Sequence, residues 1–333
     1  MGPSRVAMQV ATGAVLVAGV LAGTGSAAAA RPTVVAPDGA YISATQRVDS
    51  RELNLTVHSP AMGKAMTVSV LLPQDRSIPR GTLYLLDGAE STGALADWVT
   101  KGDASAIFAN RDMNVVMPAG GRSEFFTDWQ HPDPVVGKPM WETFLTQELP
   151  PLVDRTFDTN RHNAVAGVSE GAQSALALVA RHPALYTGVA SLSGCPAVTG
   201  PSGNAYVTAT VATTGALATN MWGPYGSPDW AAHDPTLMVD RFRGKNVFLY
   251  AGSGRPGPTD PALPRTPGQT QQETNAAGGG LETAARTCTQ QFGGQLRQAG
   301  IAATEYYPAT GLHAWLYWET VMPHALAVLQ RGL

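Results

Sequence analysis

The sequence has few charged residues and only two cysteines, and both shortages exclude broad classes of function. Charged residues make up 14% of the 333 residues, the net charge is -3, and no run of like charge marks a surface for nucleic acid. Two cysteines without a histidine cluster at ligand spacing do not make a metal site, and no glycine-rich phosphate loop indicates a nucleotide. We therefore expect no cofactor, no metal and no nucleic-acid partner.

Internal repeats and long apolar segments are also missing beyond the N-terminal region. Residues 1–30 combine Arg5, an apolar stretch at 10–22 and a run of small residues that ends at Ala30. That order is typical of a cleaved secretory signal, and the apolar stretch is short for a membrane-spanning helix. We expect a secreted or envelope-associated protein, with one domain over residues 31–333 and no transmembrane segment in the mature chain.

The expected export affects how the two cysteines, Cys195 and Cys288, are interpreted. In an oxidising compartment a lone pair of cysteines is more often a disulfide than a metal or redox site, although two buried free thiols are the alternative. A bond between them would close a long loop, which a chain-entropy model values at about 4–5 kcal/mol.

Short apolar runs alternate with longer amphipathic stretches along the chain. Most of the runs are apolar throughout, which is typical of strands buried on both faces, so we predict an α/β fold with a mainly parallel sheet between two layers of helices. The predicted strands are 66–72, 82–86, 114–117, 163–166, 187–192 and 246–250, with a strand-like run at 302–307. The predicted helices are 94–109, 141–157, 170–181, 281–298 and 318–330.

Two segments interrupt this alternation. Residues 200–222 are rich in Thr and Ala and lie between two predicted strands, where either a lid over the active site or a surface excursion fits. Residues 252–280 hold many Pro and Gly residues, so we expect a long loop there.

The most specific motif is GVSEG at residues 167–171, which matches G-x-S-x-G. A predicted strand leads into it and a predicted helix leaves it, which is the context of the nucleophile in the α/β-hydrolase fold. The sharp turn would present the Ser169 hydroxyl at a helix N-terminus, where backbone N–H groups can stabilise an oxyanion. We therefore expect Ser169 to be a nucleophile.

The chain order of that fold is Ser, then acid, then His, which places the base near the C-terminus. His313 follows the run 302–307 and is the expected base; His324 lies inside a predicted helix. The acid is left open by spacing, because Asp260, Glu273 and Glu282 all follow the strand 246–250, and spacing alone favours Asp260.

With these residues placed, much of the chain resembles the mycolyltransferases of the antigen 85 family, exported α/β-hydrolases of mycobacteria and corynebacteria. The matching phrases are spread widely over the chain: YLLDG (84–88), VMPAGG (116–121), DW (128–129), WETFL (141–145), MWGP (221–224) and HAW (313–315). The resemblance implies transfer of a mycolyl chain between trehalose monomycolates, or to cell-wall arabinogalactan, through an acyl-serine intermediate.

The resemblance also implies roles for individual residues. The family's acid is a Glu on a helix about thirty residues before the His, which favours Glu282 over Asp260. The oxyanion donors would be the backbone N–H groups of Ala89 and Glu170. Asp87 matches a residue that contacts trehalose, and Trp315 beside the base could stack on a sugar.

Two departures from the family's pattern bear on specificity. Glu90 replaces an Arg that contacts trehalose, and Glu170 replaces the usual Met after the nucleophile. If both side chains faced the pocket, they would add negative charge near His313 and favour its protonated form. The family's cysteine after the strand 246–250 is Ala251 here, and a Cys195–Cys288 bridge would instead tie the helix bearing Glu282 to the sheet edge.

Three functions follow, in decreasing order of support. The first is a serine acyltransferase that acts on trehalose mycolates or related acyl esters. The second is a secreted carboxylesterase, in which water takes the acyl group. The third is a catalytically silent envelope protein that binds a partner, against which the complete set Ser169, Glu282 and His313 argues.

Overall fold

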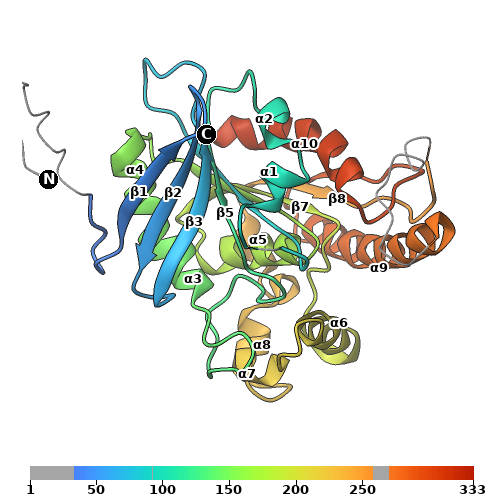
Figure 1. Cartoon of the computed structure of the whole chain (residues 1–333). Coiled ribbons are helices and arrows are strands. Elements are labelled where there is room, and N and C mark those ends of the chain that lie inside the picture. Colours follow the sequence, from blue (N-terminus) through green and yellow to red (C-terminus); the bar gives the residue numbers. More distant parts are fainter. Residues whose placement is uncertain (1–33, 92, 258–269) are drawn as a thin grey trace, which may run out of the picture. The chain divides into compact units, whose positions relative to one another are not determined.

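The structure is a computed structural model that describes residues 34–91, 93–257 and 270–333. The predicted secretory signal and Asp260 lie outside the described residues. Within them, nine strands form one sheet in the order β1-β2-β3-β5-β4-β6-β7-β8-β9 (Figure 1). The strands are β1 Tyr41–Arg47, β2 Glu52–Ser59, β3 Lys64–Leu71, β4 Thr82–Leu86, β5 Asn114–Pro118, β6 Asn163–Val168, β7 Tyr186–Leu192, β8 Asn246–Tyr250 and β9 Thr304–Tyr306.

The sheet has an antiparallel edge and a parallel remainder. β1, β2, β3 and β5 pair antiparallel, whereas each pairing from β5 through β4, β6, β7 and β8 to β9 is parallel. The central strands β4, β5 and β6 are buried along their whole length, as expected for strands covered on both faces. The predicted parallel core is therefore confirmed, but the sequence argument missed β1 and β2, whose alternating or exposed residues form the edge.

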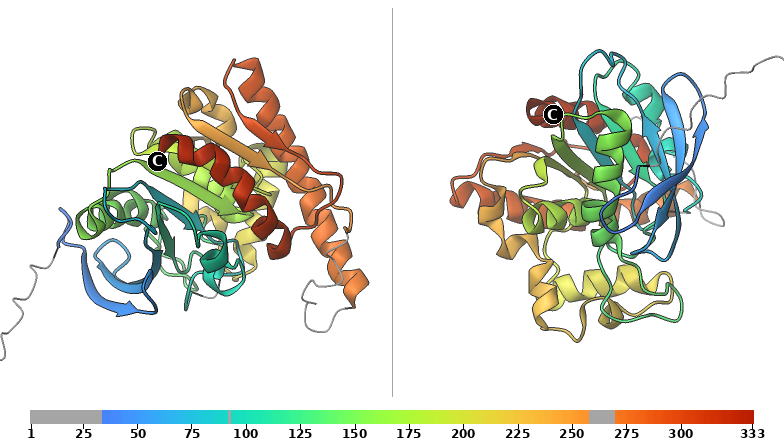
Figure 2. Two further views of the ribbon diagram at one scale, coloured as in Figure 1. Left: turned by 90° about the horizontal axis from the view of Figure 1, so that it is seen from above. Right: turned by 90° about the vertical axis from the view of Figure 1, so that its left-hand side faces the viewer.

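Helices cover both faces of the sheet (Figure 2). On one face, α4 Leu149–Phe157, α5 Glu170–Arg181 and α9 Gln271–Gln298 pack through residues such as Leu152, Leu176 and Phe292. On the other face, α1 Asp97–Thr100, α2 Ala104–Ile107 and α10 Trp315–Leu329 pack through Trp98, Ala104 and Met322.

One predicted helix is divided in the structure, and another has the predicted extent. The single helix expected at 94–109 is two short helices, α1 and α2, because Gly102 and Asp103 interrupt it and Asp103 has φ 44°. A Cβ at Gly102 would lie 2.8 Å from the Trp315 ring, so the chain needs glycine there. The segment 141–157 is helical throughout as α3 Trp141–Thr143, a π-helical turn Phe144–Glu148 and α4.

The loop predicted at 252–280 is wrong from residue 271 onward, because α9 begins there. Thr270 and Glu273 form a capping box in which each side chain accepts from the other's backbone N–H. The run Gly278–Gly280 suggested a loop, but Gly279 lies in the helix against Gly254, whose carbonyl oxygen would be 2.6 Å from an added Cβ. Small residues here allow close contact between helix and loop.

The segment 200–222 is mostly helical, and it belongs to a small unit at one end of the sheet. It contains α6 Gly200–Ala212 and α7 Ala218–Trp222, followed by α8 Pro228–Ala232 and the 3-10 turns Pro235–Leu237 and Val239–Phe242. Figure 1 shows α6, α7 and α8 gathered below the sheet. They share a core of their own with the segment after β5, formed by residues such as Phe125, Trp129, Val207, Trp222 and Trp230.

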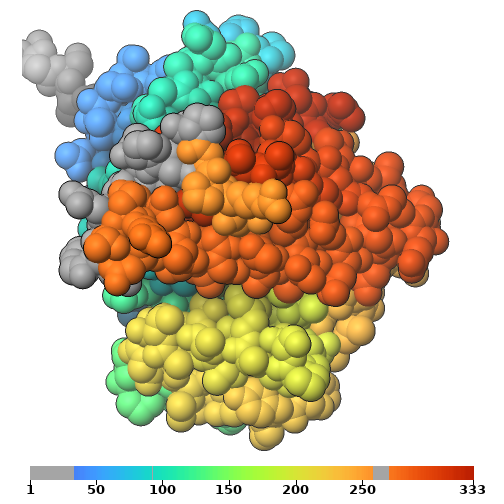
Figure 3. All heavy atoms as spheres, turned by 90° about the vertical axis from the view of Figure 1, so that its right-hand side faces the viewer, coloured from blue at the N-terminus to red at the C-terminus, as the bar shows by residue number. Residues whose placement is uncertain are grey.

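Helix α9 crosses one face of the molecule as a long orange band above the yellow α6 (Figure 3). The C-terminal helix α10 continues through Pro323, and a 3-10 turn, Gln330–Gly332, follows it. No helix among the described residues is long and apolar enough to cross a membrane.

Candidate active site

Ser169 lies in the sharp turn between β6 and α5. Its backbone has φ 55° and ψ -120°, a conformation that non-glycine residues rarely adopt. The flanking glycines make the turn possible: a Cβ at Gly167 would lie 2.1 Å from the Gly171 carbonyl oxygen, and one at Gly171 would lie 2.2 Å from that of Asp87. The motif therefore has the strand-turn-helix context that the sequence predicted.

His313 reaches Ser169 from the loop before α10. Its Nε2 lies 2.8 Å from the Ser169 Oγ, and its Nδ1 lies 2.9 Å from the Glu282 Oε2. The His313 ring stands edge-on to Trp318, and its backbone N–H donates to the Gly278 carbonyl. Residues 144 and 31 positions apart in the sequence thus form one row of hydrogen bonds.

Glu282 is fully buried on α9, and both of its carboxylate oxygens have partners. Oε2 accepts from His313, while Oε1 accepts from the Ser193 hydroxyl at 2.7 Å and from the Gly252 N–H. Of the two candidate acids within the described residues, Glu282 contacts His313, whereas Glu273 caps the N-terminus of α9.

Ser193 was not identified from the sequence. It follows β7 directly, has φ 59°, and its hydroxyl links Glu282 to the Trp318 indole N–H, which donates to it at 2.9 Å. The sequence held one signal for this role: Ser193 comes directly after the predicted strand 187–192, the next strand along the chain after the one that leads into Ser169.

The two expected oxyanion donors belong to segments that adjoin Ser169. Glu170 begins α5, so its N–H has no partner one turn back in the helix. Ala89 belongs to the loop after β4, and a Cβ at the adjacent Gly88 would lie 3.4 Å from the Ser169 Cβ. This geometry favours two backbone N–H groups near one acyl carbonyl.

Asp87, for which the resemblance implies a trehalose contact, is fully buried. Its carboxylate accepts from the Ser91 hydroxyl at 3.1 Å and from the backbone N–H groups of Asp97 and Trp98 at 2.9 and 3.2 Å. Burial raises the pKa of Asp87 to about 7, although these donors favour the charged form. Asp87 therefore attaches the loop of Ala89 to α1, and a sugar would reach its carboxylate only if that loop opened.

Glu90 and Glu170, the two acidic residues that depart from the family's pattern, differ in their exposure to solvent. The Glu90 side chain is exposed, whereas that of Glu170 is buried and accepts a hydrogen bond from the Phe125 N–H. Trp315 is partly buried and stands edge-on to Trp98 and Trp318, with ring centroids 5.2 and 5.3 Å away. Its ring thus packs against the core on the α10 face of the sheet. Trp315 lies two residues after His313 in the sequence.

The disulfide joins Cys195 to Cys288, as predicted. Their Cα atoms are 5.0 Å apart across a sequence separation of 93 residues. The bond ties α9, which carries Glu282, to the loop after β7, which carries Ser193. A covalent link thus lies close to the residues that orient His313.

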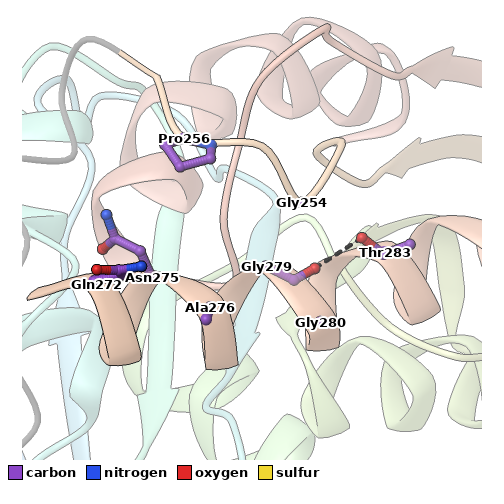
Figure 4. A pocket seen from close by; sticks show the side chains of 8 residues that line it. All are labelled: Gly254, Pro256, Gln272, Asn275, Ala276, Gly279, Gly280 and Thr283. Carbon is purple, nitrogen blue, oxygen red and sulfur yellow. Dashed lines mark hydrogen bonds between the residues drawn. The ribbon is translucent and has the colours of Figure 1, made fainter. Parts of the chain in front are cut away.

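A groove of about 800 Å³ runs between α9 and the segment after β8 (Figure 4). Its lining consists mainly of small or amide side chains: Gly254, Pro256, Gln272, Asn275, Ala276, Gly279, Gly280 and Thr283. Neither Ser169 nor His313 is among the described residues that line it. Within the described part of the chain, no group of three or more His, Cys, Asp or Glu side chains could hold a metal ion.

A strained serine in line with a histidine and a buried carboxylate, on a sheet of this topology, is the arrangement of serine enzymes of the α/β-hydrolase class. The sequence model of the esterase family matches residues 59–329, and the chain belongs to that family. Within it, the chain belongs to the antigen 85 group, as its relatives show.

The diacylglycerol acyltransferase/mycolyltransferase Ag85A of Mycobacterium tuberculosis is 30% identical over 100% of this chain and 93% of its own length. The Ag85C protein of Mycobacterium avium is 31% identical over 80% of this chain and 73% of its own. Among solved structures, Mycobacterium tuberculosis MPT51 (FbpC1) has a TM-score of 0.69 with 26% identity, over 84% of this chain and all of that one. A ferulic acid esterase with a TM-score of 0.58 and 18% identity, over 84% of this chain and 97% of its own, shares the fold.

Proposed function

We propose that this protein is a secreted serine acyltransferase that moves long acyl chains between trehalose esters, or to cell-wall arabinogalactan. The single observation that carries the proposal is the hydrogen-bonded row from Ser169 through His313 to Glu282. The names of the full-length relatives, diacylglycerol acyltransferase/mycolyltransferase, support an acyl ester as substrate. The predicted signal at residues 1–30 supports export, with residues 31–333 as the catalytic domain.

In the first half of the reaction, His313 Nε2 takes the proton of the Ser169 hydroxyl as Oγ attacks the ester carbonyl. Glu282 accepts from Nδ1–H and so holds the imidazole in the tautomer that leaves Nε2 free to act as a base. The N–H groups of Ala89 and Glu170 hold the oxyanion of the tetrahedral intermediate. Its collapse breaks the ester bond, and the imidazolium returns the proton to the departing alcohol.

In the second half, an acceptor hydroxyl replaces the departed alcohol. His313 removes its proton as the acceptor oxygen attacks the acyl-serine carbonyl. The bond to Ser169 Oγ then breaks, the imidazolium returns the proton to Oγ, and the acyl group leaves on the acceptor. A sugar acceptor makes the protein a transferase, and water makes it an esterase. Glu90, exposed where the family has a sugar-contacting Arg, gives the esterase outcome a specific structural basis.

The test is product analysis with the purified mature protein. We would incubate it with trehalose monomycolate and, in parallel, with a short-chain p-nitrophenyl ester, using Ser169→Ala and the matched surface change Ser202→Ala. Trehalose dimycolate formed by the wild type and Ser202→Ala but not by Ser169→Ala supports the transferase. Ester hydrolysis without dimycolate supports the esterase, and an absence of any Ser169-dependent reaction rejects both.

A further inference from the structure

The carboxyl group of Glu170 is placed unusually, because it belongs to the residue after the nucleophile yet turns into the protein. Its side chain is 1% exposed. Oε1 accepts from the Phe125 N–H, and Oε2 is buried without a hydrogen-bond partner among the described residues. A buried carboxyl with one unpaired oxygen is costly to stability, so its presence calls for a role.

The segment that Glu170 contacts is strained. Ser123, Phe125 and Phe126 have φ values of 55°, 55° and 43°, in the left-handed region. Each such non-glycine residue costs about 1–3 kcal/mol and persists only where the surroundings hold it. Both backbone groups of Phe125 bind side chains of the N-terminal part of α5: its N–H donates to Glu170, and its carbonyl accepts from the Ser174 hydroxyl at 2.9 Å.

The same segment reaches the second expected oxyanion donor. The Ser123 hydroxyl lies 3.3 Å from the Ala89 carbonyl oxygen, to which it donates, and 2.8 Å from the Thr213 hydroxyl at the end of α6. A continuous set of contacts therefore runs from Glu170, through residues 123–125, to the loop of Ala89. Figure 1 shows the segment after β5 running past the sheet towards α7 and α8.

The surroundings of Glu170 also bear on its charge. Burial raises the pKa of Glu170 well above its ordinary value, and the nearby Glu124 carboxylate adds to the rise, against the N–H groups of residues 123–125. The phenol of Tyr206 is the other titratable group that interacts with it. A neutral carboxyl suits this position, because an ionised one would repel the negative charge that develops on the substrate oxygen.

We infer that Glu170 is a positioning residue whose buried carboxyl holds residues 123–125, and through Ser123 the Ala89 loop, so that both backbone donors keep their place around Ser169. The inference rests on the proposed function, because it concerns the oxyanion of the acyl-transfer step. It predicts that kcat depends on the hydrogen-bond acceptor oxygen of the Glu170 side chain and not on a negative charge there.

The experiment compares Glu170→Gln with Glu170→Met in the mature protein. Gln keeps an acceptor for the Phe125 N–H, whereas Met has similar length without one. With a short-chain p-nitrophenyl ester, we expect Glu170→Met to lower kcat about 10- to 100-fold, with KM changed less than about twofold, since loss of a whole oxyanion donor lowers kcat about 100- to 1,000-fold. Glu170→Gln should stay within about threefold of the wild type.

A second pair of variants tests the same contacts without changing Glu170. Ser123→Ala removes the hydroxyl that binds Ala89, and we expect a kcat about 3- to 10-fold lower. Thr213→Val removes the other partner of that hydroxyl and should leave kcat unchanged. This pair keeps the inference testable if Glu170→Met does not fold.

A trifluoromethyl ketone, which forms a tetrahedral oxyanion adduct with a serine, separates positioning from a general loss of structure. Its affinity should weaken in parallel with kcat across the folded variants, because both report the oxyanion site. If Glu170→Met and Ser123→Ala lower only the melting temperature, with kcat and inhibitor affinity intact, the inference is overturned while the proposed function stands. If the wild type itself shows no Ser169-dependent reaction, both fail.

Discussion

Glu170 and Glu282 are two buried glutamates, one directly after Ser169 and one joined to it through His313, and their carboxyl groups have different surroundings. Glu282 has partners for both oxygens, three donors in all, and one of them is the His313 ring. Glu170 has one oxygen paired with a backbone N–H and the other unpaired, and burial raises its pKa. The comparison teaches that identical side chains near one reaction centre take different roles according to the donors around them.

Glu282→Gln tests the catalytic side of this comparison and has the largest expected effect. A Gln side chain presents an N–H or a poorly oriented oxygen to Nδ1, which favours the wrong imidazole tautomer. We expect kcat to fall about 1,000- to 10,000-fold with little change in KM, measured with a short-chain ester.

Glu273→Gln is the matched control on the same helix, since Gln can still close the capping box. Its kcat should remain within about twofold of the wild type. A Glu282→Gln variant as active as this control would remove Glu282 from the proposed mechanism.

Removal of the disulfide tests how much the anchoring of α9, the helix that carries Glu282, contributes to stability. Replacing Cys195 and Cys288 together by Ala frees a loop of 93 residues in the unfolded chain. We expect the free energy of unfolding to fall by about 2–4 kcal/mol, measured by urea denaturation with and without reductant. Equal midpoints for the wild type and the double variant under oxidising conditions would contradict this expectation.

Glu142 is a third buried glutamate, outside the serine turn, and it has charged partners that Glu170 lacks among the described residues. It binds Arg181 at 2.7 Å and His182, with His233 3.4 Å away. Burial alone would raise the pKa of Glu142, but the hydrogen bonds from His182, His233 and Arg181 outweigh it and hold the pKa well below the ordinary range. The network joins α3, the end of α5 and the turn after α8.

Because its folded pKa is lowered, Glu142 contributes stability above its unfolded pKa of 4.5, and this contribution is lost as the pH falls further. Glu142→Gln should reduce the free energy of unfolding by about 2–3 kcal/mol at neutral pH. The difference from the wild type should shrink by about 1 kcal/mol per pH unit below the unfolded pKa. Denaturation curves at neutral pH and about one unit below that pKa check this, and an unchanged difference would refute it.

Thr270→Ala has the smallest expected effect and tests the start of the helix that delivers Glu282. Loss of the N-cap should cost about 1 kcal/mol and speed amide exchange in the first turn of α9. Since Glu282 lies three turns further on, kcat should not change. Hydrogen exchange measured by mass spectrometry would show the effect, and equal exchange rates in both proteins would argue against a working cap.

The strands were predictable because a buried parallel strand is apolar along its whole length. β4 and β8 lie at the predicted residues, and α5 runs over the predicted range. The edge strand β1 was missed because it is exposed along most of its length, so it lacks that signal. The start of α9 was missed because its glycines suggest a loop locally, whereas contact with Gly254 makes them suitable inside the helix.

The sequence by itself determined the serine turn, since only glycine fits at positions 167 and 171, and it determined His313 through the chain order of the fold. Spacing alone favoured Asp260, which lies outside the described residues, and only the resemblance indicated Glu282. Tertiary structure alone decided that Glu282 meets His313, that Ser193 supports it and that Glu170 turns inward. The reason is physical: each of these contacts joins side chains from separate elements, and their partners are fixed by how the sheet, α9 and the segment after β5 pack together.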